Sequence, residues 1–404
     1  MDSARPLRVL VAGLSWPPET FLERLLVGLA LSGVEVVVAS PRRPSGMPVQ
    51  WISAPSWRGP SPVRLLRSVG SAAAAWVRSP AETKMALDGD QRAGARRQVR
   101  ALHDLAPPIG RDWDVLYFPW NSAAAAHLPL FGIGKPVVVS CRGTQLNIAP
   151  HNPRRRADVA RYFTALERAT VVHCVSDDLE RIVVGQGIPR GKVRVIRPAV
   201  DPSFFSPGRV TVNPEQGLRL VTTGSLIWRK GHVSLLLALR ALLDTGRRTH
   251  LRVIGDGPEH QRLLYTIGDL GLSDSVDLLG RHDETQVRNE LRQADIFVLS
   301  SLSEGISNAA LEAMSCGLPV VSTDVGGMAE AIRDGVEGRL VPPRDPEATA
   351  EALAQLGGDR QLRLQMGAAA RERVVSQFSL ERHIAAWREL LDTVLQRHRV
   401  GAMP

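Results

Sequence analysis

Cysteines are few in this chain, and they lie far apart. Three occur among 404 residues, Cys141, Cys174 and Cys316, and none of them has the paired spacing of a zinc site. Each lies in or beside an apolar run, which indicates a small side chain that fills space in a core. Such usage fits a reducing, cytosolic compartment.

Long hydrophobic runs are also missing. No stretch reaches about 18 uninterrupted apolar residues, so we expect no helix that spans a membrane. The apolar run at residues 7–12 is too short for the hydrophobic region of a secretory signal, and no cleavage site follows it. We therefore expect a cytoplasmic protein and leave open a peripheral association with the inner face of the membrane.

Acidic residues are outnumbered, since 50 Lys and Arg against 41 Asp and Glu give a net charge of +9. This excess suits phosphate-bearing ligands or an anionic membrane surface. The positive residues are dispersed, and the sequence has no zinc-finger spacing, basic leucine zipper or aromatic RNA-binding signature, so we expect no nucleic-acid partner. The length predicts two domains, each with its own core.

Short β-branched runs alternate with longer helical segments, a pattern that predicts parallel α/β units. Prolines and a glycine at residues 198–208 mark a linker, so we expect a first domain over 1–205 and a second over 206–378. Both are predicted to be Rossmann-like, with ligands at the carboxyl ends of their strands. Strands are expected at residues 9–12, 34–39, 115–118, 136–140, 171–175 and 193–196, then at 218–222, 251–254, 276–279, 296–300 and 320–323.

Several helices and loops of the first domain can be predicted as well. Gly13 permits close backbone approach after the first strand, Thr20 can cap the helix at 20–31, and Gly33 ends it. The segment 42–59, rich in Pro and Ser, reads as a loop. Basic helices are expected at 63–77 and 83–105, either as a solvated face or as a contact with an anionic acceptor or lipid. Their arginines are Arg64, Arg67, Arg78, Arg92, Arg96, Arg97 and Arg100.

A glycine turn joins the first strand of the second domain to its helix. It contains Gly224 and Ser225, followed by Arg229 and Lys230 at the helix start. Backbone N–H groups at such a turn attract anions, and the two cationic side chains could neutralise a diphosphate. The spacing is not that of a P-loop, and the G-x-G at 255–257 lacks the third glycine of a dinucleotide fingerprint.

Glu304 and Glu312 lie eight residues apart, between a strand-like and a helix-like run. If both were helical they would be separated by about 12 Å, at roughly 1.5 Å per residue. Carboxylates that cleave one glycosidic bond in a hydrolase lie only ~5–9.5 Å apart. The pair is therefore suited to holding two ends of a long ligand, such as a sugar and the ribose of its nucleotide.

These segments together resemble the retaining family-four glycosyltransferases of the GT-B fold. The resemblance implies two Rossmann-like domains facing across a cleft, with a last helix, in 379–404, that crosses back to the first domain. It extends over nearly the whole chain. It is carried by Gly224…Lys230-Gly231, by Gly255-Asp256-Gly257-Pro258-Glu259, and above all by Ser303-Glu304-Gly305…Leu311-Glu312-Ala313 with Gly317-Leu318-Pro319.

The resemblance also implies roles for particular residues. Glu304 would bind donor-sugar hydroxyls and support charge near the reacting carbon, and Glu312 would hold the ribose. Lys230, with Arg229, would neutralise the diphosphate. N–H groups around Ser307, Asn308 and Ala309 would help, because helix N-termini also favour negative charge. Other expected donor-site residues are Gly13, Gly224, Ser225, Arg281, His282, Gly305, Ser307, Asn308 and Ala309.

Two positions depart from the family pattern. Members often carry Arg where this chain has Ser225, and many have a His-Gly pair where it has Arg142 and Gly143. We assign Arg142, Gly143 and Thr144 to the acceptor side. Arginine does not act as a base at neutral pH, so the base is left open between His127, His151 and the leaving phosphate.

The expected function is transfer of a sugar from a UDP- or GDP-linked donor to a hydroxyl of a glycan, a lipid-linked or a small-molecule acceptor. No metal motif is present, and we expect neither a metal nor another cofactor, since basic side chains can carry the phosphate charge. Three alternatives remain at this stage. They are a non-catalytic sugar-nucleotide-binding partner of another transferase, a sugar-nucleotide epimerase, and an oxidoreductase.

Overall fold

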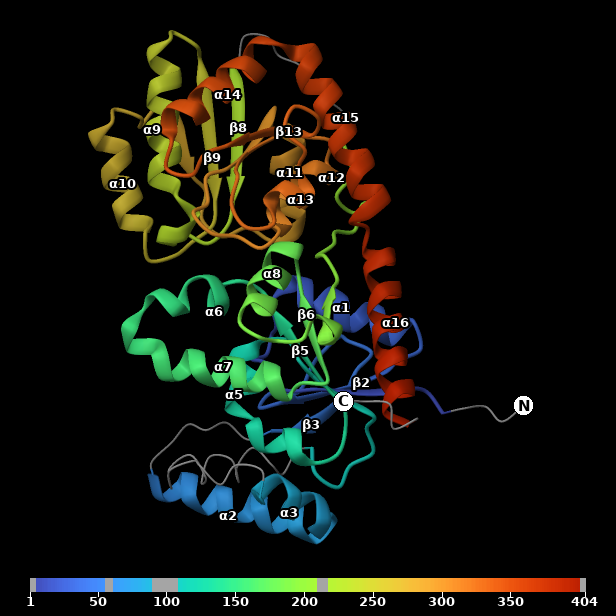
Figure 1. Ribbon diagram of the computed structural model, residues 1–404. Helices are drawn as coiled ribbons and strands as arrows, with labels where there is room; N and C mark the ends of the chain where they lie inside the picture. The colour runs from blue at the N-terminus through green and yellow to red at the C-terminus, as the bar shows by residue number, and fades with distance from the viewer. Residues whose placement is uncertain (1–4, 55–60, 89–107, 209–216, 400–404) are drawn as a thin grey trace. The chain divides into compact units, whose positions relative to one another are not determined.

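The computed structural model describes residues 5–54, 61–88, 108–208 and 217–399, which form two compact units (Figure 1). The first unit contains Met1–Val175, Leu179–Ile196 and Ile384–Pro404, and the second contains Ser176–Asp178 and Arg197–His383. The last helix of the chain thus belongs, from Ile384 onward, to the first unit.

The first unit is built on a seven-stranded parallel sheet with the order β3-β2-β1-β4-β5-β6-β7. The chain order reverses between β1 and β4, and ligands of doubly wound sheets bind at the carboxyl ends of strands beside such a reversal. The strands are β1 (Arg8–Val11), β2 (Glu35–Ser40), β3 (Gln50–Ser53), β4 (Val115–Phe118), β5 (Val137–Cys141), β6 (Val171–Cys174) and β7 (Val193–Val195).

Helices cover both faces of this sheet because alternate strand residues point to opposite sides. Leu116 and Phe118 of β4 pack in one core with α5, α7 and α8, whereas Val115 and Tyr117 pack in another with α1 and α16. The helices are α1 (Thr20–Leu31), α2 (Ser61–Arg78), α3 (Pro80–Asp88), α5 (Asn121–Ala126), α6 (Thr144–Asn147), α7 (Arg156–Arg168), α8 (Asp177–Gly185) and α16 (Leu380–Arg399).

The second unit is built on a six-stranded parallel sheet with the order β10-β9-β8-β11-β12-β13. Phe297 of β11 packs against α12 and α15, and Val298 packs on the opposite side against α9 and α14. The strands are β8 (Leu218–Thr223), β9 (Thr249–Ile254), β10 (Val276–Leu278), β11 (Ile296–Leu299), β12 (Val320–Thr323) and β13 (Gly338–Val341), and the helices are α9 (His232–Asp244), α10 (His260–Asp269), α11 (Glu284–Gln293), α12 (Asn308–Ser315), α13 (Met328–Ala331), α14 (Pro346–Gly358) and α15 (Arg360–Gln377).

Several local predictions were wrong. The segment 42–59 contains β3, and β13 was not predicted; both are edge strands with partly exposed residues and therefore lack a clear burial pattern. The cap of α1 is Glu19 rather than Thr20. The second basic helix begins at Pro80, as α3, and the part of that prediction beyond Asp88, with Arg92, Arg96, Arg97 and Arg100, lies outside the described residues.

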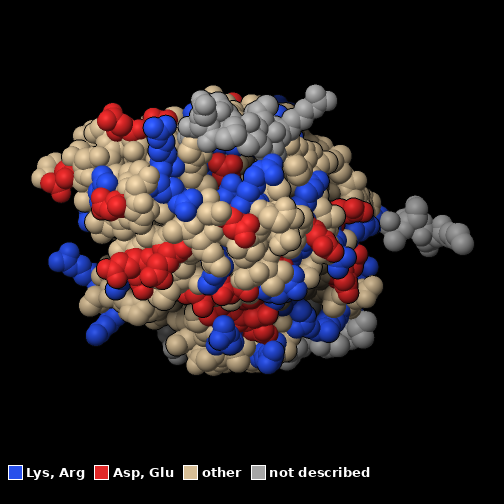
Figure 2. Space-filling view, turned by 90° about the horizontal axis from the view of Figure 1, so that it is seen from above, with Lys and Arg blue, Asp and Glu red and all other residues tan. Residues whose placement is uncertain are grey.

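The predicted core role of the cysteines is confirmed, because Cys141, Cys174 and Cys316 are all free and buried. On the face in Figure 2 basic and acidic side chains are interspersed, so the net charge of +9 does not gather there into one basic patch.

Trp387 attaches α16 to the first sheet. It is fully buried, with ring centroids 4.9 Å from Tyr117 and 4.6 Å from His173. We expect Trp387→Ala to lower the free energy of unfolding by about 3–5 kcal/mol, because it removes a large buried side chain and leaves a cavity. Urea denaturation measures the change. Trp228→Ala, at a side chain that is 55% exposed, is the control and should change stability by less than about 0.5 kcal/mol.

Candidate active site

Glu304, a buried carboxylate, forms an ion pair with the partly buried Lys230 at the carboxyl edge of the second sheet. The Lys230 ammonium donates to Glu304 Oε1 at 2.5 Å, and the Ser301 hydroxyl donates to the same oxygen at 2.7 Å. Glu304 is only 8% exposed. A buried pair of charges is tolerated when further hydrogen bonds satisfy it, and here Ser301 supplies one.

The loop that carries Lys230 is held against the loop after β11. Leu302 N–H donates to the Arg229 carbonyl at 2.7 Å, and the Ser300 hydroxyl donates to the Lys230 carbonyl at 3.0 Å. Gly231 follows with a left-handed φ of 66°, and a Cβ at this position would lie 2.0 Å from the Ser300 carbonyl oxygen. Only glycine therefore fits here, and these contacts fix the backbone that carries Lys230.

The backbone of Glu304 is fixed from its other side by the turn after β12. Gly327 N–H donates to the Gly305 carbonyl at 2.8 Å. Gly326 lies so close to the Glu304 carbonyl oxygen that a Cβ would approach it to 2.0 Å. Thr323 also donates to the Ser301 carbonyl at 2.6 Å. Three neighbouring strands, β8, β11 and β12, thus position one carboxylate.

The predicted anion-binding helix start is α12. Ser307 is its N-cap, and its hydroxyl accepts a hydrogen bond from Ala310 N–H. Asn308 and Ala309 are the first two residues of α12, and N–H groups at the start of an α-helix have no acceptor within the helix. The side-chain oxygen of Asn308 is buried and has no hydrogen-bond partner among the described residues. The two N–H groups are suited to an anionic ligand, whereas the Asn308 oxygen, an acceptor, is suited to a ligand hydroxyl.

The helical separation considered for the two glutamates does not apply, because only Glu312 is helical. Glu304 lies in the loop four residues before α12 begins, and Glu312 lies about one turn inside the helix. A helical rise therefore does not describe their separation. Glu312 is half-buried.

The remaining predicted donor-site residues lie in loops at the same edge of the sheet. Ser225 is exposed, Arg229 is half-buried, and Gly224 lies beside the Lys230 side chain. Arg281 is exposed and His282 half-buried, in the loop before α11. Within the described residues neither Arg281 nor His282 has a hydrogen bond to Lys230 or Glu304.

In the first unit, Arg142 follows β5 and packs against two neighbouring aromatic rings. Its guanidinium carbon lies 4.4 Å from the Phe21 ring centroid and 5.7 Å from that of Trp120. Its N–H groups donate to the Pro119 carbonyl at 3.2 Å and to the Tyr117 hydroxyl at 3.3 Å. These contacts hold the guanidinium in one orientation at the carboxyl ends of β4 and β5.

Sequence reasoning missed a chain of buried hydrogen bonds that continues from Tyr117. The Tyr117 hydroxyl lies 3.0 Å from Ser140 Oγ, which lies 2.7 Å from His173 Nδ1, and His173 Nε2 lies 2.8 Å from the Ile196 carbonyl. The carbonyl only accepts, so Nε2–H donates to it, and a neutral imidazole then accepts from Ser140. Because the chain crosses β4, β5 and β6, only strand pairing could have revealed it.

Other predicted residues of the first unit have structural surroundings. Gly13 packs on α5, where a Cβ would lie 2.5 Å from Ala123 Cβ. Gly143 precedes the short α6, which begins at Thr144. His127 is bonded through Nδ1 to the Ala123 carbonyl at 2.8 Å, and His151 is exposed.

His232, which follows Gly231, has a perturbed proton affinity. Burial and the nearby charge of Lys230 lower the pKa of His232 from 6.5 to about 4. The folded protein therefore keeps this imidazole neutral over a range in which the unfolded chain protonates it.

We expect the free energy of unfolding to fall as the pH drops from 6.5 toward 4, because the unfolded state then binds the extra proton. The two pKa values correspond to a loss of about 3 kcal/mol at most. Urea unfolding at about pH 7 and about pH 4.5 measures it, with His232→Gln as the comparison. The variant should lose less stability over this interval, and equal losses would contradict the prediction.

Known proteins are similar to this chain in both sequence and fold. Residues 18–204 match the family model described as Glycosyltransferase Family 4, and residues 209–373 match the one described as Glycosyl transferases group 1. The amylovoran biosynthesis glycosyltransferase AmsK of Erwinia amylovora is 30% identical over 298 residues, which cover 72% of this chain and 71% of AmsK.

Solved structures are similar over nearly the whole chain. Sucrose-phosphate synthase from Thermosynechococcus elongatus has a TM-score of 0.73 at 18% identity, covering 97% of this chain and 100% of its own. HepE from Anabaena, solved in complex with UDP-glucose, has a TM-score of 0.70 at 16% identity, covering 96% of this chain and 99% of its own.

The two doubly wound parallel units therefore have the fold of the GT-B class of glycosyltransferases, as the sequence predicted. The chain belongs to glycosyltransferase family 4 and is a glycosyltransferase. This supports transfer over the binding-partner, epimerase and oxidoreductase alternatives.

Proposed function

We propose that this glycosyltransferase is a metal-independent, retaining enzyme that moves a sugar from a nucleoside diphosphate to a hydroxyl acceptor. The observation that carries the proposal is the buried Lys230–Glu304 pair beside the start of α12. A cation and free helix N–H groups can stabilise a diphosphate leaving group, and the carboxylate lies where a sugar attached to that diphosphate would extend.

In this proposal Lys230 and Arg229 neutralise the charge that develops on the departing phosphate, together with N–H groups around Ser307, Asn308 and Ala309. The bond from the anomeric carbon to the phosphate oxygen breaks, and a bond to the acceptor oxygen forms on the same face of the sugar. The acceptor proton passes to the leaving phosphate. Glu304 binds sugar hydroxyls and supports positive charge near the anomeric carbon.

Nucleotide recognition is assigned to Glu312, which would bind the ribose, and to the loop with Arg281 and His282, which would meet the base. HepE, with UDP-glucose, and its relatives support a uridine nucleotide, and guanosine is the other candidate. The acceptor is assigned to the loop of Arg142, Gly143 and Thr144. The oriented guanidinium of Arg142 suits an acceptor with an anionic group, and the name of AmsK supports a polysaccharide intermediate.

Replacing Glu304 by Ala should reduce kcat by about a hundredfold or more, because the site loses a charge that acts in the transition state. Release of the nucleoside diphosphate measures turnover, and thermal unfolding confirms that the variant folds. Glu312→Gln should instead raise the KM for the donor more than it lowers kcat. Glu351→Ala, at an exposed position of α14, is the control. Normal turnover by Glu304→Ala would remove this carboxylate from the mechanism.

We also infer that the enzyme contacts anionic lipid through α2. No helix in the described part of the chain is long and apolar enough to cross a membrane. The side of α2 that packs inward consists of small residues, including Ser68, Ser71 and Ala75. Its exposed side carries large apolar residues: Leu66 is 73% exposed and Val77 84%. α2 also carries the exposed Arg67 and has no acidic residue, which suits an anionic surface.

Wild-type protein should sediment with vesicles that contain phosphatidylglycerol and not with neutral vesicles. The double variant Leu66→Gln, Val77→Gln should bind about a hundredfold more weakly or worse, because burial of each of the two apolar side chains contributes about 1.5 kcal/mol or more. Leu237→Gln, which changes an exposed leucine of α9, is the matched control. Equal binding by the double variant and the control would exclude α2 as the contact.

A further inference from the structure

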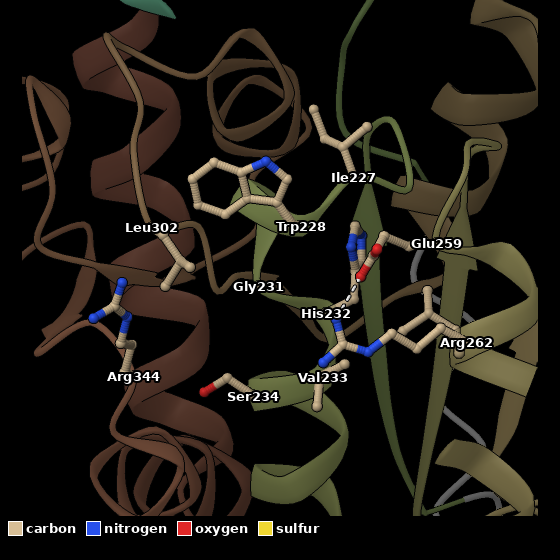
Figure 3. A pocket seen from close by; sticks show the side chains of 11 residues that line it. Ile227, Trp228, Gly231, His232, Val233, Ser234, Glu259, Arg262, Leu302 and Arg344 are labelled. Carbon is tan, nitrogen blue, oxygen red and sulfur yellow. Dashed lines mark hydrogen bonds and ion pairs between the residues drawn. The ribbon is translucent and has the colours of Figure 1, made fainter. Parts of the chain in front are cut away.

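A recess that is separate from the Lys230–Glu304 pair lies in the second unit, on the α9 side of the turn that carries Lys230. It has a volume of about 250 Å³ and is lined by Trp228, the first residues of α9, Arg262 and Arg344 (Figure 3). The roles proposed above for the donor and acceptor use none of these side chains. Its place at the carboxyl ends of the strands is where parallel sheets bind ligands.

The start of α9 presents uncapped N–H groups to this recess. The N-cap is Gly231, which has no side chain that could accept from them, and α9 is 13 residues long. The first N–H groups of a helix have no intrahelical acceptor, and the helix dipole adds partial positive charge there. His232, Val233 and Ser234, the residues that carry these groups, line the recess.

His232 gives an independent indication of a ligand. Its side chain lines the recess and is 7% exposed, yet Nδ1 has no hydrogen-bond partner among the described residues. Figure 3 shows its imidazole between Trp228 and Glu259. A buried polar atom without a partner is costly, and a bound ligand oxygen would remove this cost.

Two arginines flank the same space. Arg344 has a φ of 63°, the one positive value outside glycine in the described part of the chain. Residues other than glycine adopt this conformation rarely, and often at functional sites. Within the described residues Arg344 has no ion pair. Arg262, on the other side of the recess in Figure 3, pairs with Glu259 at 3.0 Å, so the one carboxylate here is already neutralised.

The remaining walls are apolar. Trp228 is 55% exposed and presents its indole to the recess beside Ile227 and Leu302. An indole face suits the C–H face of a sugar ring, and the volume exceeds what a bare phosphate needs. The recess therefore combines one anionic subsite with one flat apolar subsite, as small-ligand sites commonly do.

We propose that this recess binds a phosphate monoester carried on a sugar, separately from the nucleotide-sugar donor. The phosphate oxygens accept from the N–H groups at the start of α9, from Arg344 and from Arg262, while the sugar ring lies on Trp228. The turn is shared with the donor site, since Leu302 lines the recess and its N–H donates to the Arg229 carbonyl.

Calorimetric titration of the full chain with three probes tests the proposal. Glucose 6-phosphate should bind, inorganic phosphate should bind more weakly, and glucose should not bind. Arg344→Gly removes the guanidinium while glycine accepts the left-handed backbone, and it should weaken glucose 6-phosphate binding about tenfold or more. Arg240→Gln, which removes a charge from α9 away from the recess, should have no effect. Glu304→Ala should also leave binding unchanged.

Several results would overturn the proposal. One is the absence of binding by either phosphate probe. Another is equal affinity in wild type, Arg344→Gly and Arg262→Gln. If UDP displaces glucose 6-phosphate, or if Lys230→Met no longer binds glucose 6-phosphate, the probe occupies the donor site instead of the recess. Equal affinity for inorganic phosphate and glucose 6-phosphate would overturn the role given to Trp228.

Discussion

The ion pair between Lys230 and the buried Glu304 constrains where the loops at the carboxyl edge of the second sheet can lie. Two charges removed from water need each other and further hydrogen bonds, so the loops that carry them must be placed accurately. The sheet provides this because β8 and β11 are neighbours in the strand order, although Lys230 and Glu304, which follow these strands, are 74 residues apart in sequence. Hydrogen bonds from Ser300 and Leu302 to the Lys230 turn then fix the remaining freedom.

The same turn has two sides with different properties. On one side are the ammonium, the carboxylate and the start of α12; on the other are the start of α9, the buried imidazole of His232 and the indole of Trp228. Gly231 makes this arrangement possible, since its close approach to the Ser300 carbonyl lets the chain pass from a tight turn directly into α9. One short segment therefore joins two sites.

In the first unit the guanidinium of Arg142 is held by hydrogen bonds and aromatic rings and, among the described residues, not by an ion pair. Arg142 is oriented by two neighbouring rings and by Tyr117, and Tyr117 is itself held by Ser140 and His173. Trp387 of α16 packs against both Tyr117 and His173. The orientation of a surface guanidinium thus depends on a helix that comes from the end of the chain.

The sequence by itself determined the fold class and the family, because buried parallel strands appear as β-branched runs and because the segment around Glu304 and Glu312 is distinctive. It also placed the glycine turn of Lys230 and the start of α12. Only the tertiary structure decided that Lys230 pairs with Glu304, that Tyr117 leads to His173, and that the apolar side of α2 is exposed. Those facts come from strand order and packing between residues distant in sequence, which local patterns do not encode. The edge strands β3 and β13 were missed for the related reason that partial exposure removes the apolar pattern by which central strands are recognised.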